Sequence, residues 1–94
     1  MDNIIKKGFT NVPDALVNDV RLTRDARFLY VYLAYKKQSE KFTNADIESG
    51  MNFTNETRIK YIKELVKYRW IKVIKKRDKY GRFIQNEIML NTPL

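Results

Sequence analysis

The spacing of apolar residues changes at Trp70, and this change constrains the fold more than any other feature of the sequence. Before Trp70, apolar residues recur every three or four positions, which is typical of helices. After it, apolar residues recur with a period of two, at Ile71 and Val73 in 70–77 and at Ile84, Ile88 and Leu90 in 83–90, which indicates two strands. Asp78–Gly81 separates them, and Gly81 is suited to the positive φ of a tight turn. The sequence therefore predicts helices followed by an antiparallel β-hairpin.

The first helices are predicted from their capping residues. Pro13 suits the first position of a short helical turn, and Thr23 is a plausible N-cap for a long helix from Arg24 to about Lys37. This long helix carries two apolar stripes. One stripe is expected to face the core: Ala26, Leu29, Tyr30 and Leu33. The other stripe indicates either a helix placed centrally in the core or a dimer interface: Phe28, Val31, Tyr32 and Tyr35.

The next two helices form a predicted helix-turn-helix over about 43–69. Thr43 and Asp46 fit a capping box, Phe42 and Ile47 fit a hydrophobic staple, and Gly50 is expected to end the helix. After a turn at 51–53, Thr54 or Asn55 would cap a helix that runs to about Tyr68 or Arg69. Four of its residues are expected to face inward: Ile59, Ile62, Leu65 and Val66.

Basic residues concentrate in the last of these helices and in the hairpin. The 94 residues include 19 lysines and arginines against 11 acids, a net charge of +8. Segment 58–82 alone holds eleven basic and two acidic residues, which gives it a net charge of +9, whereas the remaining residues together carry −1. A charge excess gathered in this way favours a polyanionic partner, nucleic acid above all, although a plain solvated face is the alternative.

Two groups of residues are candidates for contacts with double-stranded DNA. The helix would present polar side chains to base edges in the major groove: Thr54, Asn55, Thr57, Arg58 and Tyr61. The hairpin, or wing, over about 70–90 would place side chains in a narrow minor groove: Lys75, Lys76, Arg77, Lys79, Tyr80 and Arg82. We expect the wing to contribute at least as much binding free energy as the helix. Trp70 is expected in the core, whereas Tyr80 could stack on DNA or simply be exposed.

The composition disfavours catalysis. The chain has no cysteine and no histidine, and its three glycines are isolated, so it offers no thiolate, no imidazole base and no glycine-rich phosphate loop. We therefore expect no enzyme, no catalytic residue, no metal and no cofactor. The longest apolar run, Phe28–Tyr35, is too short to span a bilayer, and the N-terminus lacks a signal-peptide pattern. We expect a cytoplasmic protein that does not interact with membranes.

Three segments resemble the winged helix-turn-helix domains of plasmid and phage replication initiators. These segments are Phe9–Leu16 with Leu22-Thr23 and Ala26–Leu33, then Phe42–Ile47 with Thr54–Leu65 and Trp70-Ile71, then Lys75–Phe83. Position 58 departs from the pattern because it is often aliphatic in such helices and is Arg here. The resemblance covers about residues 9–90 and implies a single winged helix-turn-helix domain, mainly α with a small antiparallel hairpin.

The resemblance also implies a function. It predicts sequence-specific binding to double-stranded DNA at a replication or transfer origin, as a homodimer that recruits replication or conjugation proteins. Initiators usually carry a further C-terminal domain, whereas this sequence ends at Leu94, so both an excised domain and a free-standing accessory binder are open. A transcriptional regulator of a mobile element is an alternative within the same class. A winged-helix adaptor that binds protein and not DNA is the alternative from another class.

Overall fold

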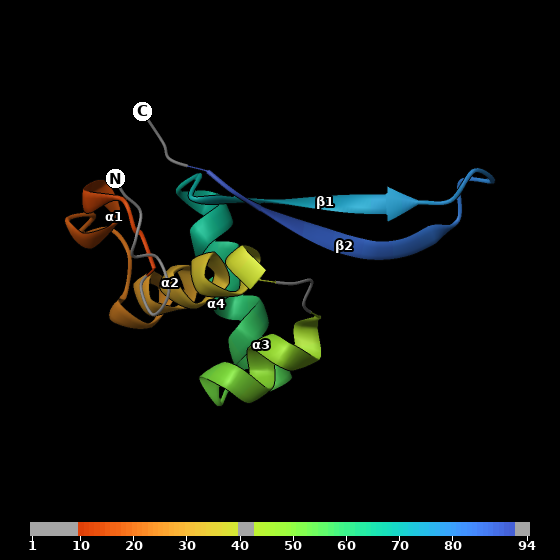
Figure 1. The fold of residues 1–94 in the computed structure, drawn as a ribbon. Coiled ribbons are helices and arrows are strands. Elements are labelled where there is room, and N and C mark those ends of the chain that lie inside the picture. The colour runs from red at the N-terminus through yellow and green to blue at the C-terminus, as the bar shows by residue number, and fades with distance from the viewer. Residues whose placement is uncertain (1–9, 40–42, 92–94) are drawn as a thin grey trace.

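The computed structural model describes residues 10–39 and 43–91, which form four helices and one two-stranded antiparallel sheet. Their bounds are α1 (Asp14–Val17), α2 (Arg24–Ser39), α3 (Asn44–Met51), α4 (Asn55–Lys67), β1 (Ile71–Arg77) and β2 (Phe83–Leu90). The helices cluster together, and the β1–β2 hairpin projects away from them as an arm (Figure 1). This arrangement confirms the prediction of a mainly helical chain that ends in a small antiparallel hairpin.

Three threonines begin the longer helices, as their positions in the sequence predict. The Thr23 Oγ1 accepts a hydrogen bond from the backbone N–H of Ala26 at 3.2 Å. Thr43 and Asp46 form the complete capping box, because each side chain accepts from the backbone N–H of the other residue. Thr54, not Asn55, is the N-cap of α4. The predicted staple partner Phe42 lies outside the described residues.

The prediction that Gly50 ends the helix is wrong. Helix α3 continues through Met51, and Asn52 takes the left-handed conformation at its end with φ 58°. Asn reaches this conformation more readily than most residues because its short polar side chain bonds locally. Gly50 serves packing instead, since the Tyr32 ring lies where a Cβ at position 50 would be. The Tyr32 Oη also donates a hydrogen bond to the Asp46 carbonyl at 3.2 Å.

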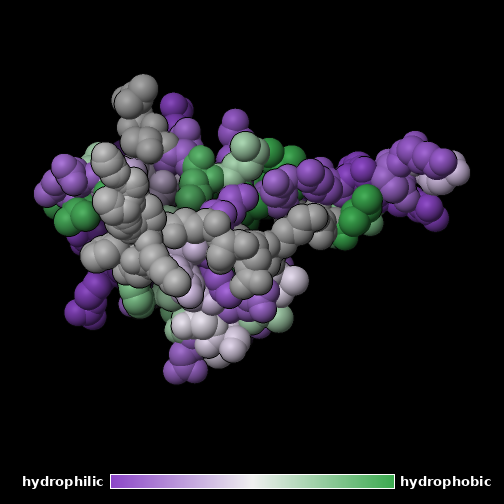
Figure 2. All heavy atoms as spheres, in the orientation of Figure 1, coloured by the Kyte–Doolittle hydropathy of each residue, from purple (hydrophilic) through white to green (hydrophobic). Residues whose placement is uncertain are grey.

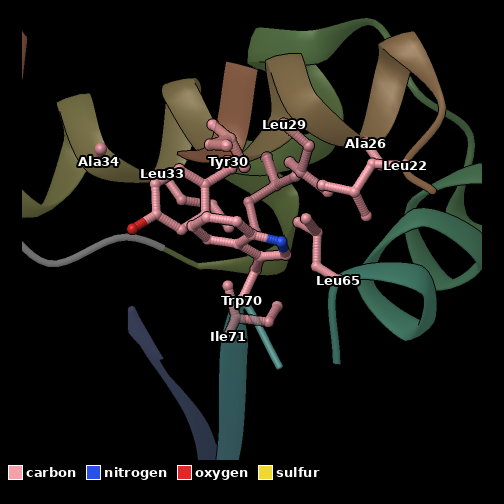
Figure 3. Close-up of a cluster of buried hydrophobic side chains, with 11 residues drawn as sticks. Leu22, Ala26, Leu29, Tyr30, Leu33, Ala34, Leu65, Trp70 and Ile71 are labelled. Atoms are coloured by element: carbon pink, nitrogen blue, oxygen red, sulfur yellow. The ribbon is translucent and has the colours of Figure 1, made fainter. Parts of the chain in front are cut away.

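The core is built on α2 and closed by Trp70. All four members of the first predicted stripe are buried: Ala26, Leu29, Tyr30 and Leu33. The Trp70 indole, which is 2% exposed, meets the Tyr30 ring edge-on at a centroid distance of 5.6 Å (Figure 3). Leu65 from α4 and Ile71 from β1 complete this side of the cluster. The prediction that Trp70 belongs to the core is confirmed, and its position joins the helices to the base of the arm.

Asp19 fixes the Trp70 indole from the loop between α1 and α2. Its carboxylate accepts a hydrogen bond from the Trp70 Nε1–H at 2.8 Å and pairs with Arg21, also at 2.8 Å. The hydrogen bonds from Arg21 and from Trp70 hold the pKa of Asp19 well below its usual range. The Arg21 guanidinium in turn lies 4.7 Å from the centre of the Tyr68 ring. The loop is thereby fastened to the junction of α4 and β1.

That junction is a Schellman turn with an unusual residue at its left-handed position. The Trp70 N–H donates to the Leu65 carbonyl at 2.9 Å, and the Arg69 N–H donates to the Val66 carbonyl at 3.0 Å. Arg69 has a φ of 67°, where glycine is the usual residue. The Asn91 side chain donates to the Arg69 carbonyl at 2.7 Å, which ties the end of β2 to the same turn.

The rotation of α4 differs from the sequence prediction. Leu65 is buried and Ile62 packs against the core, as expected, but Ile59 and Val66 are 37% and 42% exposed. Tyr61 and Tyr68 pack against the core in their place. The sequence pattern favours aliphatic residues as the inward set, whereas the large aromatic side chains bury more apolar surface. With these tyrosines inward, the outer face of α4 presents Lys60, Lys63 and Lys67 to solvent.

The second stripe of α2 divides into two parts. Val31 packs against the core and Tyr32 is half-buried, whereas Phe28 and Tyr35 are exposed. The expectation of a stripe wedged in the core therefore holds for two of its four members. Phe28 and Tyr35 are seven residues apart and thus lie on one helix face.

Candidate nucleic-acid interface

The outward face of α4 is mainly basic. Six exposed residues form it: Glu56, Ile59, Lys60, Lys63, Val66 and Lys67. Within residues 10–39 and 43–91, none of these three lysines takes part in an ion pair. Lys60 and Lys67 lie 5.3 Å from the centres of the Tyr61 and Tyr68 rings. This face can therefore offer three ammonium groups to phosphates, with Glu56 as the opposing charge near the helix N-terminus.

The helix residues that the sequence nominates for base contacts are largely engaged with the protein itself. The Thr54 Oγ1 accepts from the Thr57 N–H at 3.1 Å and bonds the Thr57 hydroxyl at 2.9 Å, so both threonines belong to the cap. The Asn55 Oδ1 accepts from the Arg58 guanidinium at 2.7 Å. Of the five, Thr54 and Asn55 are exposed at the helix start, whereas the other three are half-buried.

Arg58 connects α4 to α3. Its Nε lies 2.8 Å from a carboxylate oxygen of Glu48, and its side chain is 12% exposed. The guanidinium therefore occupies a largely buried position between α3 and α4. Glu48, which lies on α3, supplies the charge that makes an arginine tolerable there.

Tyr61 likewise connects two helices. Its hydroxyl donates to the Asp25 carboxylate on α2 at 3.2 Å, and its ring lies 5.5 Å from that of Phe53. Burial raises the pKa of Tyr61, and the bond to Asp25 raises it further. Tyr61, which the sequence nominates for a contact in the major groove, is thus used in packing between helices.

The two acids within the basic segment are engaged in local structure. The Glu64 carboxylate accepts from both the backbone N–H and the hydroxyl of Thr23, which places it at the start of α2. The Asp78 carboxylate accepts from the backbone N–H groups of Arg82 and Tyr80 and from the Arg82 side chain. The backbone bond from Arg82 is the main cause that lowers the pKa of Asp78. Both acids therefore have partners that hold them in place.

The arm carries the densest positive charge. Six exposed cations lie along it: Lys72, Lys75, Lys76, Arg77, Lys79 and Arg82. Figure 2 shows hydrophilic residues over most of the projecting arm, with a hydrophobic region along its outer part. Two of the cations are paired, Lys76 with Glu87 at 3.0 Å and Arg82 with Asp78 at 2.8 Å. The other four form no ion pair within the described residues and are available to an anionic partner.

The turn of the arm agrees with the prediction. Gly81 has a φ of 82°, and its N–H donates to the Asp78 carbonyl at 2.9 Å. Tyr80 is exposed, and its ring centre lies 5.2 Å from Lys79 Nζ and 5.2 Å from Arg82 Cζ. An aromatic ring flanked by two cations at the end of a projecting hairpin can contact both a sugar and its phosphates.

The lysines of the α4 outer face belong to the basic segment recognised in the sequence, but they are not among the residues nominated there for DNA contacts. Positions 60, 63 and 67 have the spacing of one helix face, and the cap at Thr54 fixes where the helix begins. The residues nominated for DNA contacts are instead the polar side chains near the N-terminus of the helix.

The described part of the chain offers neither a metal site nor a membrane-spanning helix. It has no cluster of three potential metal ligands among its Asp and Glu residues, and no helix in it is both long and apolar enough for a membrane span.

Comparison of the chain with protein-family models, curated protein sequences and solved structures finds no match.

Proposed function

We propose that this protein binds double-stranded DNA sequence-specifically, with a winged helix-turn-helix built from α3, α4 and the arm. In this arrangement α4 lies along the major groove and the arm reaches the adjoining minor groove. The order of α2, α3, α4 and a hairpin, after the short α1, supports the proposal, since it matches the architecture that the sequence resembles.

One observation carries the proposal above the others. Seven exposed cations that form no ion pair within the described residues lie on two adjacent elements, three on the outer face of α4 and four on the arm, whose chain segments meet at Trp70. A surface that only confers solubility mixes charges of both signs, whereas a phosphate-binding surface gathers one sign. The segment contains only two acids, Glu64 at the start of α2 and Asp78 paired with Arg82, so the cations far outnumber them.

A salt series tests the proposal. If about five phosphates are contacted, log K should fall against log salt with a slope of about −5. Lys60→Ala with Lys63→Ala should make the slope about 2 units shallower, because each lysine accounts for about one phosphate. The matched control removes the same charge from α2, as Arg24→Ala with Lys37→Ala, and should leave the slope unchanged. A salt-independent affinity would favour the protein-binding adaptor.

Selection of bound sites from a pool of random duplexes tests the sequence specificity. A specific site should bind at least about 1,000-fold more tightly than the unselected pool. Equal binding of all duplexes would reduce the function to charge-driven association. The expected setting, a replication or transfer origin of a mobile element, is part of the proposal and depends on the sequence resemblance.

The exposed pair on α2 favours self-association as a second property. Phe28 and Tyr35 are 61% and 54% exposed on one face of the helix. A dimer formed through this face would present two arms to a palindromic or repeated site. Phe28→Glu should then halve the mass measured by light scattering, whereas an unchanged mass would exclude this face. Tyr32→Glu is unsuitable for the purpose because Tyr32 is packed against α3.

A further inference from the structure

The arm contains a β-bulge that places two neighbouring apolar residues on the same side. Arg77 is paired with Phe83, whereas Ile74 is paired with Glu87, and the register shifts between Lys76 and Arg77. Side chains alternate along a strand, so the residue paired with Arg77 shares the face of Arg77. Ile84 precedes Glu87 by three positions and therefore lies on the face opposite to that of Glu87 and Ile74. Phe83 and Ile84 thus both lie on the face of Arg77, which an unbroken register would not allow.

These two residues are exposed although they are strongly apolar. Phe83 is 54% and Ile84 is 57% exposed, whereas Ile88 and Leu90, nearer the base of the same strand, pack against the core. The hydrophobic part of the outer arm is visible in Figure 2 among hydrophilic neighbours. Folding of the domain does not bury this pair, so a role in contact with a partner explains it better than stability does.

The surrounding charges identify the class of partner. Lys75 and Arg77 share the face of the pair, and Lys79 and Arg82 flank the turn beyond it. The buried centre of a protein–protein interface is depleted of charged residues, especially Lys, which argues against a protein partner on this face. A duplex supplies what both kinds of side chain require, since its phosphates attract the cations and the spaces between its base pairs accept apolar groups.

From this arrangement we infer that Phe83 and Ile84 form a wedge that enters the minor groove, partly unstacks one base step and bends the duplex. The inference deepens the proposed DNA binding and depends on it. Apolar side chains cannot recognise base edges by hydrogen bonds. They contribute to sequence specificity because the energy needed to unstack a base step depends on its sequence. The preferred substrate is accordingly a duplex with a flexible pyrimidine–purine step, such as TA, where the wedge is accommodated most easily.

Energy transfer across a short duplex tests the wedge. The probe is a 20-base-pair duplex with a central TA step and a dye at each end, titrated with the protein at 50 mM salt. A kink of about 60° would shorten an end-to-end distance of roughly 68 Å by about 9 Å. Phe83→Ala with Ile84→Ala should abolish the shortening. The matched control is Met89→Ala, an exposed residue that is paired with Lys72 on the opposite face of the arm, and it should bend the duplex as the wild type does.

A second readout detects unstacking directly. 2-Aminopurine at the central step should brighten on binding of the wild type and of Met89→Ala, and should stay dim with the double variant. Cooperative unfolding of each variant in urea establishes that it is folded.

The outcomes separate the inference from the function on which it depends. Failure of the wild type to bind any duplex overturns both. Binding without a change in end-to-end distance, or equal bending by the double variant, overturns the wedge and leaves DNA binding intact. A dimer that the double variant converts to a monomer would assign the pair to a protein interface and would also overturn the wedge.

Discussion

Replacing Gly50 with alanine should destabilise this protein, although the same change stabilises most helices. In a helix interior, alanine is favoured over glycine by about 1 kcal/mol. Gly50 lies within α3, and a Cβ there would come closer than 3.0 Å to the Oη, Cζ and Cε1 atoms of Tyr32. Two of these atoms belong to a rigid ring, so the side chain must rotate away as a whole.

The size of the effect follows from what Tyr32 loses. Rotation breaks its hydrogen bond to the Asp46 carbonyl, a loss of about 1 kcal/mol. Lost packing or an unfavourable rotamer adds roughly 1–2 kcal/mol. After subtraction of the gain in helix propensity, Gly50→Ala should lower the free energy of unfolding by about 1–2 kcal/mol.

A double-mutant cycle measured by urea unfolding isolates this contact. In a Tyr32→Ala background the obstruction is gone, so Gly50→Ala should instead raise the free energy of unfolding by about 1 kcal/mol. The coupling between the two positions is then about 2–3 kcal/mol. Ser49→Ala, on the exposed part of α3, is the control and should be additive with Tyr32→Ala. Stabilisation by Gly50→Ala in the wild-type background would refute the role assigned to Tyr32.

Three further changes test the core and the junction. Leu65→Ala should lower the free energy of unfolding in urea by about 2–5 kcal/mol because it opens a cavity beneath Trp70, whereas the exposed neighbour Val66→Ala should lower it by less than about 1 kcal/mol. Arg69→Gly should raise the same quantity by up to about 1 kcal/mol, since glycine adopts its φ of 67° without strain, and a lower value would contradict this account. Asp19→Asn should lower the melting temperature at neutral pH. The lowered pKa of Asp19 means that its contribution is present above about pH 4, the ordinary carboxyl pKa, and is lost as the pH falls toward the folded-state pKa. The difference from wild type should therefore shrink in acid, and a constant difference would exclude the carboxylate as its cause.

Much of the fold could be predicted because its signals are local. Threonine caps act within one helical turn, and the hairpin turn needs only Asp78 and a glycine three residues later. The period-two spacing of apolar residues predicts β2 with the bounds observed, and the position of Trp70 directly after a helix predicts that it packs in the core. None of these inferences requires knowledge of a distant contact.

The predictions that failed depend on contacts between segments. In the sequence Gly50 resembles the end of a helix. In the fold, the ring of Tyr32, eighteen positions earlier, occupies the space that a Cβ at position 50 would fill. The assignment of Ile59 as inward depended on apolar character alone, whereas the rotation of α4 is set by Tyr61 against Asp25 and by Arg58 against Glu48. The bulge at Phe83 likewise arises from strand pairing, which the sequence pattern does not specify.

Arg58 offers the sharpest distinction between a residue that reads DNA and one that holds the domain together. The position of Arg58 near the start of α4 predicts a base-reading residue, whereas its bonds to Glu48 and Asn55 and its low exposure indicate a structural role. If that role is correct, Arg58→Ala should lower the free energy of unfolding by about 1–2 kcal/mol, because it leaves Glu48 without its partner and opens space between the helices.

Arg58→Leu combined with Glu48→Gln removes the ion pair but fills the same space with an aliphatic side chain. Because a half-buried pair contributes little more than a well-packed apolar group, this double variant should retain nearly the wild-type stability. Site selection from random duplexes then separates the two roles. An unchanged preferred sequence means that Arg58 only sets the position of α4, whereas a preference lost at one or two base pairs, in a domain that is still stable, would restore Arg58 as a reader of bases.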